Sequence, residues 1–215
     1  MSKIGVVCPS RGTMFSKTTE SIFDNIKGFD DVGLYMAHGR PIPECFNEPL
    51  ERALDDGCNW IWFVEEDMLI PPDTLKKFLF LDQPVVTTDY ADRRTELPLI
   101  MRDNVEEVVF SGMGCMLVKR EVFEKMEKPY LRQMVFWRRE EPNGDVFWDP
   151  QPQIKCESYG QQDIYLCWAI KKAGYRIHEV KTKIGHMSLL SKAEDIINNG
   201  GDVIKTVYLD YATEG

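Results

Sequence analysis

The first 90 residues alternate between short apolar runs and segments with helical periodicity, and this alternation limits the possible folds more than any other feature. The predicted strands are residues 4–8, 32–37, 60–64 and 84–88, and the predicted helices between them are residues 18–27, 43–56 and 71–81. Each helical segment has apolar residues spaced for one buried face. Such a series predicts an α/β fold, with a mostly parallel sheet, flanking helices and right-handed crossovers.

The rest of the chain is less regular. We expect strands at 97–101, 105–110, 115–118 and 175–180, helices at 120–127 and 160–173, an irregular segment at 129–158, and a tail from 191 onward that forms a helix and an extended end. The later strands predict a mixed sheet. The sequence contains no internal repeat, low-complexity block or linker, so residues 1–215 are predicted to form a single domain.

Charge and cysteine content narrow the functional classes. Lys and Arg number 26 and Asp and Glu number 35, which gives a net charge of −9. Such a chain is not held to nucleic acid by a general basic field, although a local basic groove stays open. The apolar runs are far shorter than the roughly 20 residues that span a bilayer, and the N-terminus lacks a secretion signal. The six cysteines form no C-x-x-C pair, so we expect reduced thiols in a cytoplasmic protein.

Three consecutive acids, Glu65, Glu66 and Asp67, follow the apolar run at 60–64. Ligands of open α/β sheets bind beyond the carboxyl ends of the strands. In an extended chain Glu65 and Asp67 would point to the same side, and a divalent cation would relieve their repulsion. Carboxylate oxygens suit Mg²⁺ or Mn²⁺. The alternative is a solvated strand end whose acids face the N-terminus of the next helix.

Two further strand ends carry glycine or a cation. Arg11 follows Pro9 and can pair with a diphosphate or stack on a base, or it is a surface arginine beside a turn. Gly112 and Gly114 bracket one residue before an apolar strand. They permit close approach of a ligand, or they form a tight turn. Neither segment fits a Walker A loop or the dinucleotide fingerprint.

Asp163 and His186 complete the set of candidates. Asp163 lies in the first turn of a predicted helix, as a catalytic base or as a partner of the helix dipole. His186 follows the last predicted strand of the 1–190 region. It is a structural histidine unless it meets Glu65 and Asp67 in space.

Together these landmarks resemble a glycosyltransferase of the GT-A fold, family 2. The resemblance covers about residues 3–187 and rests on four segments in order: 60–75 (WIWFVEEDMLIPPDTL), 112–118 (GMGCMLV), Gln162-Asp163 and His186. The first segment is similar to the family's strand, DxD acids and following helix start. Two residues depart from the family pattern. Glu65 stands where the family has an Asp, and Gln162 stands where the family has an acidic residue.

The resemblance implies a GT-A, Rossmann-like sheet and a set of roles. Residues 1–90 would be the nucleotide-sugar half, 91–190 the acceptor and catalytic half, and 191–215 a C-terminal tail. Asp163 would be the base that deprotonates the acceptor. The metal ligands for Mn²⁺ or Mg²⁺ would be Glu65, Asp67 and His186. The residues that bind the nucleotide sugar would be Pro9, Arg11, Arg40, Asn47, Glu66, Gly112 and Gly114.

The implied activity is metal-dependent transfer of a sugar from a nucleoside-diphosphate sugar, with uridine favoured, to an acceptor hydroxyl. The acceptor candidates are a modified DNA base, a glycan and a small molecule. Trp137, Arg138 and Trp148 would stack on a sugar ring or a base of the acceptor, or they would close a lid or form a satellite core. Arg93-Arg94 with Arg138-Arg139 would supply a local basic track for DNA.

Small free-standing enzymes of this kind also occur in bacteriophages, which would place the protein in the host cytoplasm. Two alternatives stay open. One is a sugar-phosphate nucleotidyltransferase, although the loop after the first strand has only the glycine at position 12. The other is a non-catalytic module that binds nucleotide sugars, for which Gln162 in place of an acid is the argument. The oligomeric state is open.

Overall fold

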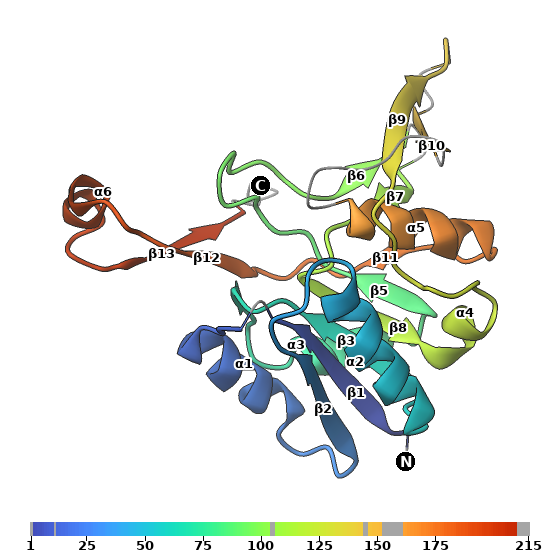
Figure 1. Cartoon of the computed structure of the whole chain (residues 1–215), viewed down its shortest axis with the longest axis horizontal. Coiled ribbons are helices and arrows are strands. Elements are labelled where there is room, and N and C mark those ends of the chain that lie inside the picture. The colour runs from blue at the N-terminus through green and yellow to red at the C-terminus, as the bar shows by residue number, and fades with distance from the viewer. Residues whose placement is uncertain (1, 11, 104–105, 144–145, 152–160, 210–215) are drawn as a thin grey trace.

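A six-stranded sheet forms the centre of the computed structural model, in the order β11-β5-β8-β3-β1-β2 (Figure 1). The structure describes residues 2–10, 12–103, 106–143, 146–151 and 161–209. The pairings within this sheet are parallel except the two made by β8. The predicted mostly parallel α/β sheet is therefore confirmed. Its strands are β1 (Ile4–Pro9), β2 (Val32–Ala37), β3 (Trp60–Val64), β5 (Val85–Thr87), β8 (Cys115–Lys119) and β11 (His178–Glu179).

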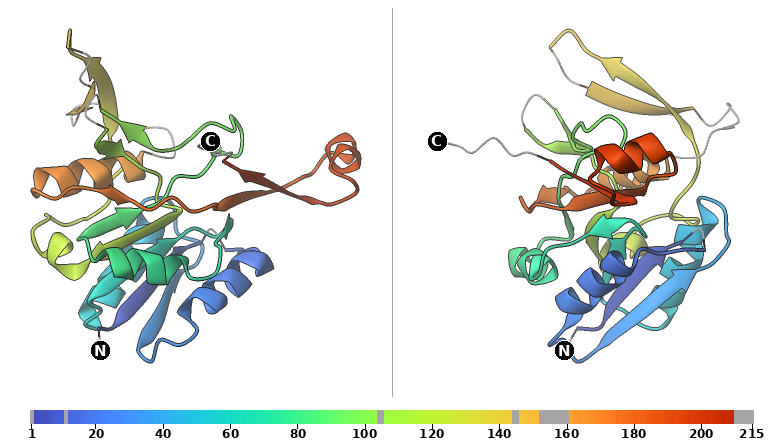
Figure 2. Two further views of the ribbon diagram at one scale, coloured as in Figure 1. Left: turned by 180° about the vertical axis from the view of Figure 1, so that it is seen from behind. Right: turned by 90° about the vertical axis from the view of Figure 1, so that its left-hand side faces the viewer.

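Helices cover both faces of the sheet (Figures 1 and 2). The side chains of β3 alternate between two apolar clusters, with Phe63 in one and Trp62 in the other, as expected for a strand buried on both faces. One cluster contains residues of α1 (Ser16–Ile26) and α3 (Thr74–Leu81), and the other contains residues of α2 (Glu44–Asp55), α4 (Arg120–Glu124) and α5 (Gln162–Lys172). These helices lie within the predicted helical segments or extend them by a turn at most.

Smaller sheets surround the central one. A three-stranded sheet joins β4 (Met68–Leu69), β12 (Gly185–Leu189) and β13 (Ile204–Tyr208), and α6 (Ala193–Asn198) connects the last two. In Figures 1 and 2 the β12–β13 arm and the hairpin of β9 (Val135–Glu140) and β10 (Val146–Gln151) project from the molecule. The pairing of β12 with β4 places His186 opposite Met68, next to the acidic cluster.

Three predictions for the second half are wrong. Residues 129–158 are not irregular throughout, because β9 and β10 form an antiparallel hairpin. Residues 97–101 are not a strand, because the Asp89 carboxylate accepts the backbone N–H groups of Leu99 and Ile100. Only Met101–Arg102 (β6) is extended there, and it pairs with β7 (Val108–Phe110), which is shorter than predicted and lies outside the central sheet.

The cysteines in the described part of the chain are buried. Cys8, Cys45, Cys58, Cys115 and Cys167 are buried free thiols, and Cys156 lies outside the described residues. None of the helices within the described ranges has the length and apolar character needed to span a bilayer.

Candidate active site at the carboxyl end of the sheet

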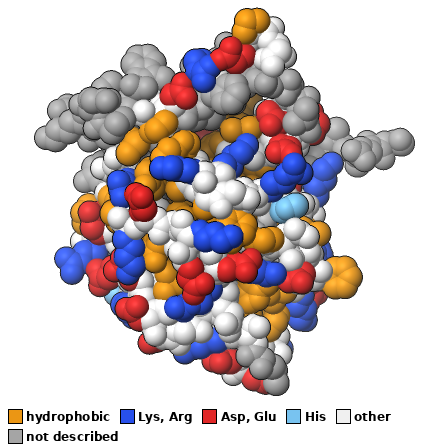
Figure 3. Space-filling model, turned by 90° about the vertical axis from the view of Figure 1, so that its right-hand side faces the viewer, with side chains coloured by type: hydrophobic (Ala, Val, Ile, Leu, Met, Phe, Trp, Pro, Cys, Tyr) orange, Lys and Arg blue, Asp and Glu red, His pale blue; other side chains and the backbone are white. Residues whose placement is uncertain are grey.

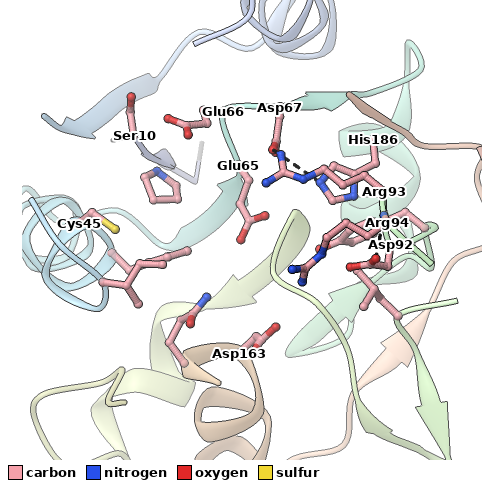
Figure 4. Close-up of a pocket in the computed structure, with 16 residues that line it drawn as sticks. Ser10, Cys45, Glu65, Glu66, Asp67, Asp92, Arg93, Arg94, Asp163 and His186 are labelled. Atoms are coloured by element: carbon pink, nitrogen blue, oxygen red, sulfur yellow. Dashed lines mark hydrogen bonds and ion pairs between the residues drawn. The ribbon is translucent and has the colours of Figure 1, made fainter. Parts of the chain in front are cut away.

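A cavity of about 400 Å³ lies where β1 and β3 end (Figure 4). It brings together side chains from distant parts of the sequence: Pro9, Glu65, Asp67, Arg93, Asp163 and His186. Their positions follow from the topology, since parallel strands place their carboxyl ends at one edge of the sheet. Six of the site residues predicted from the sequence therefore line one cavity, namely Pro9, Glu65, Glu66, Asp67, Asp163 and His186.

The acidic cluster forms a turn rather than an extended strand end. The Met68 N–H donates to the Glu65 carbonyl at 3.3 Å, so the backbone bends between β3 and β4. Glu65 and Glu66 both line the cavity, and Figure 4 shows the Glu65 side chain pointing into it and Glu66 lying on the side of Ser10. The Glu66 carbonyl accepts the hydroxyl of Thr18 at 3.0 Å, which fixes the turn against α1. The prediction of an extended segment here is wrong.

The Asp67 carboxylate lies next to two basic side chains, those of Arg93 and His186. Its Oδ2 lies 2.5 Å from Nη1 of Arg93 and 3.6 Å from Nε2 of His186. The other ring nitrogen, Nδ1 of His186, donates to the Ala91 carbonyl at 3.0 Å. Burial lowers the pKa of His186, but the Asp67 carboxylate and the Ala91 carbonyl outweigh burial and raise the pKa above its usual value.

The predicted metal ligands are neighbours, but their arrangement does not fit a divalent cation. The guanidinium of Arg93 occupies Oδ2 of Asp67 and already neutralises the charge of this carboxylate. Within the described ranges, no three His, Cys, Asp or Glu side chains are grouped so that they could hold a metal ion. From the sequence, Arg93 is predicted only as part of a basic track. Its place just after the predicted strand at 84–88 was the signal that it belongs to the site.

Asp163 lies at the N-terminus of α5 and faces the cavity. Its Oδ1 accepts the backbone N–H of Ile164 at 2.9 Å. Burial raises the pKa of the Asp163 carboxyl to about 6, and the backbone hydrogen bonds only partly oppose this shift. A carboxyl group with this pKa can accept a proton near neutral pH, as a general base must.

Gln162 lines the same cavity, and its side-chain oxygen is buried. No donor within the described part of the chain reaches this Oε1 atom. A buried amide oxygen in native proteins has a hydrogen-bond partner in most cases, and a substrate hydroxyl would supply one here.

The two glycines of the 112–118 segment accommodate a side chain of this protein. The Gly114 N–H donates to the Tyr90 hydroxyl at 2.8 Å. A Cβ atom on Gly114 would lie 2.7 Å from that oxygen, and one on Gly112 would be closer still. Tyr90 is 2% exposed and its ring packs edge-on against His186, with centroids 5.5 Å apart. Tyr90 was not predicted as a site residue, although both Tyr90 and Arg93 come soon after the predicted strand at 84–88.

We expect Gly112→Ala to lower the free energy of unfolding by about 1–3 kcal/mol, because the new methyl group overlaps the Tyr90 hydroxyl. Urea denaturation measures this change. The matched control is Gly112→Ala in a Tyr90→Phe background, where removal of the hydroxyl should recover part of the loss. Equal losses in both backgrounds would show that Tyr90 is not the obstacle.

The remaining candidates lie elsewhere. Arg40 is exposed and pairs with Glu48 at 3.0 Å, outside the cavity. The Asn47 side chain binds both backbone polar groups of Leu131, at 2.8 and 3.0 Å, so it joins α2 to the segment before β9. Arg11 lies outside the described residues. Trp137, Arg138 and Trp148 are in β9 and β10, where Arg138 pairs with Trp148, but their side chains are outside the described part.

No family model matches the chain, and no curated protein matches it by sequence. Among solved structures, 4-diphosphocytidyl-2C-methyl-D-erythritol synthase from Anaerococcus prevotii DSM 20548 is similar over 92% of this chain and 96% of its own, with 11% identity and a TM-score of 0.45, which is too distant to carry an argument. A197 from STIV is similar over 100% of this chain and 97% of its own, with 18% identity and a TM-score of 0.54. The chain therefore shares with A197 a Rossmann-like fold, and the likeness extends to the fold alone.

Proposed function

We propose that this protein transfers a sugar from a nucleoside-diphosphate sugar to an acceptor hydroxyl. One observation carries the proposal: a carboxyl group with a pKa of about 6 lies across the cavity from the arginine-bearing end of the sheet (Figure 4). A displacement reaction with a charged leaving group needs both features. A base accepts the proton of the nucleophile, and fixed cations stabilise the leaving diphosphate.

The proposed reaction uses both sides of the cavity. The donor lies along the carboxyl ends of β1 and β3, with its diphosphate near Arg93 and Arg94. The acceptor oxygen attacks the anomeric carbon while the bond between that carbon and the diphosphate oxygen breaks. Asp163 takes the proton of the attacking hydroxyl, and the electron pair of the broken bond leaves with the diphosphate. Gln162 offers its buried Oε1 to a substrate hydroxyl.

Charge favours a neutral acceptor over DNA. Arg93 is paired with Asp67, and Arg139 is paired with Asp149 at 2.8 Å and with Glu141. Figure 3 shows Lys and Arg interspersed with Asp and Glu on one face of the molecule. With a net charge of −9, this pattern gives weak attraction for a polyanion. We therefore favour a glycan or a small molecule as the acceptor.

A thermal-shift screen of nucleoside diphosphates and their sugars tests the proposal. A ligand that binds only the folded state at 100 times its Kd stabilises that state by about 2.7 kcal/mol. We expect the diphosphate and the diphosphate sugars of one nucleoside to raise the melting temperature. The same nucleoside without phosphates should raise it less.

The product then separates the classes of enzyme. Release of nucleoside diphosphate with a glycosylated acceptor supports the proposal. Formation of a sugar 1-phosphate with consumption of pyrophosphate would instead indicate a nucleotidyltransferase. If no nucleotide changes the melting temperature, the proposal is wrong.

A further inference from the structure

We propose that Arg93 and Arg94 bind the diphosphate of the donor and that no divalent cation takes part in this contact. The inference rests on the proposed function, because it names the groups that recognise the leaving phosphates. It replaces the metal centre that the sequence predicts at Glu65, Asp67 and His186.

The Arg93 guanidinium already occupies the carboxylate that a metal would need. Its Nη1 lies 2.5 Å from Oδ2 of Asp67, and the side chains are 32% and 6% exposed. A hydrogen bond between two ions in a partly buried site is stronger than one between neutral groups. A metal bound to Oδ2 of Asp67 would have to displace this guanidinium. The pair uses one N–H of Arg93, and a guanidinium has five, so donors are left for phosphate oxygens.

The loop at 90–99, which bears both arginines, is held in place before any ligand binds. The Asp89 carboxylate accepts N–H groups at both ends of the loop, from Tyr90 at 2.9 Å and from Leu99 at 3.1 Å. Between them, Asp92 Oδ1 accepts the N–H groups of Arg94 and Thr95, each at 2.9 Å. Preorganised cations stabilise a developing charge without a cost of reorganisation during the reaction.

His186 supports the same loop from β12. Its Nδ1 donates to the carbonyl of Ala91, two residues before Arg93. Its Nε2 faces the carboxylate that holds Arg93. One ring nitrogen of His186 therefore contacts the loop, and the other faces Asp67, which binds Arg93. We assign His186 a positioning role and not that of a metal ligand.

The Arg94 side chain is directed into the same cavity. Figure 4 shows its guanidinium pointing into the cavity, toward the space between Glu65 and Asp163. Within the ranges that the structure describes, Arg94 forms no salt bridge, whereas Arg93 has Asp67. A diphosphate in this cavity would lie near the carboxylates of Glu65 and Asp67, so it needs adjacent positive charge. Two neighbouring guanidinium groups match the geometry of phosphate oxygens.

Calorimetric titration with UDP, GDP, ADP and CDP, each with EDTA and with Mn²⁺, tests the inference. We expect the nucleotide that binds to have the same Kd in both conditions. Arg93→Ala and Arg94→Ala should each weaken its binding by about 10- to 100-fold, since each removes charged hydrogen bonds. Arg93→Lys keeps the positive charge but lacks the paired N–H donors of a guanidinium. It should therefore weaken nucleotide binding less than Arg93→Ala does. Arg176→Ala is the matched control, because this exposed arginine pairs with Glu107 outside the cavity and should bind as the wild type does.

Titration of Mn²⁺ alone, followed by the paramagnetic resonance of the free ion, gives an independent readout. The wild type should bind Mn²⁺ weakly, and Arg93→Ala should bind it more tightly, because Asp67 is then released. Circular dichroism confirms that each variant is folded.

The outcomes distinguish the two proposals. Nucleotide binding that requires Mn²⁺ would overturn the inference and leave the proposed function intact. Equal Mn²⁺ affinity in the wild type and Arg93→Ala would also overturn it. If no nucleotide binds in either condition, both proposals are wrong.

Discussion

Asp163→Asn is expected to slow sugar transfer by about 10²- to 10⁴-fold, the range over which a general base contributes. The substitution keeps the shape of the side chain and an oxygen that accepts the Ile164 N–H at the start of α5. It removes only the ability to take a proton. The affinity for the nucleoside diphosphate should therefore match the wild type, because the base acts on the acceptor. Rates at saturating donor, together with calorimetric titration of the nucleotide, measure the two quantities.

The pH dependence follows from the same carboxyl group. Its pKa is raised from 3.8 to about 6 by burial, and only the ionised form is a base. The transfer rate should rise with pH through about 6 and then level off in the wild type. Asp163→Asn should lose this rise. A wild-type rate independent of pH between 5 and 8 would show that Asp163 is not the base.

Stability distinguishes a lost base from a damaged fold. Because the pKa of Asp163 is higher in the folded state, the folded state binds this proton more tightly, and its stabilising effect is lost as the pH rises from about 4 to 6. At pH 8 we therefore expect Asp163→Asn to raise the free energy of unfolding by about 2 kcal/mol. A variant that is inactive but more stable has not lost activity through a damaged fold.

Asp67→Ala is expected to lower the free energy of unfolding by about 3 kcal/mol, the lower end of the range for breaking a buried ion pair. The side chain of Asp67 is 6% exposed, and it lies against Arg93 and His186. Removal leaves both groups without their carboxylate. The loss stays at the lower end because Arg93, at 32% exposure, can turn toward water. Urea denaturation at neutral pH measures it.

The control is Glu48→Ala. Glu48 in α2 also pairs with a cation, Arg40 at 3.0 Å, but both side chains are well exposed. Exposed pairs contribute little to stability, so the midpoint should not change measurably. A double-mutant cycle with Arg93→Ala should give a coupling of about 1–3 kcal/mol between Asp67 and Arg93. Additive losses would mean that the two side chains do not interact in solution.

The central sheet could be predicted from local patterns, because the apolar runs of the sequence are its buried strands. Residues 60–64 are an unbroken apolar run between polar neighbours, and β3 has these bounds. The helices follow the same logic, with apolar spacing that matches one buried face. The hairpin at β9 and β10 was missed because its strands carry charged residues and Pro150, which predict loops when their partners are unknown.

The site was harder to predict, because its decisive contacts join residues far apart in the sequence. Glu65, Asp67, Asp163 and His186 could be chosen as strand-end or helix-start positions, and they line one cavity. Nothing local to Arg93 reveals that Asp67, 26 residues earlier, would hold its guanidinium. Asn47 shows the converse, since its polar side chain is taken by the backbone of Leu131, 84 residues later.

The place of β8 has a consequence for synthesis of the chain. β8 lies between β3 and β5, although both are made before it. On the ribosome, β1, β2 and β3 can pair as soon as residue 64 has emerged, but the other edge of β3 has no partner until residue 119. That edge belongs to the apolar segment WIWFV, whose bare hydrogen-bonding groups are a template for pairing with other chains. Nascent chains that stall before residue 119 therefore expose an unpaired apolar strand edge, which favours pairing with other chains.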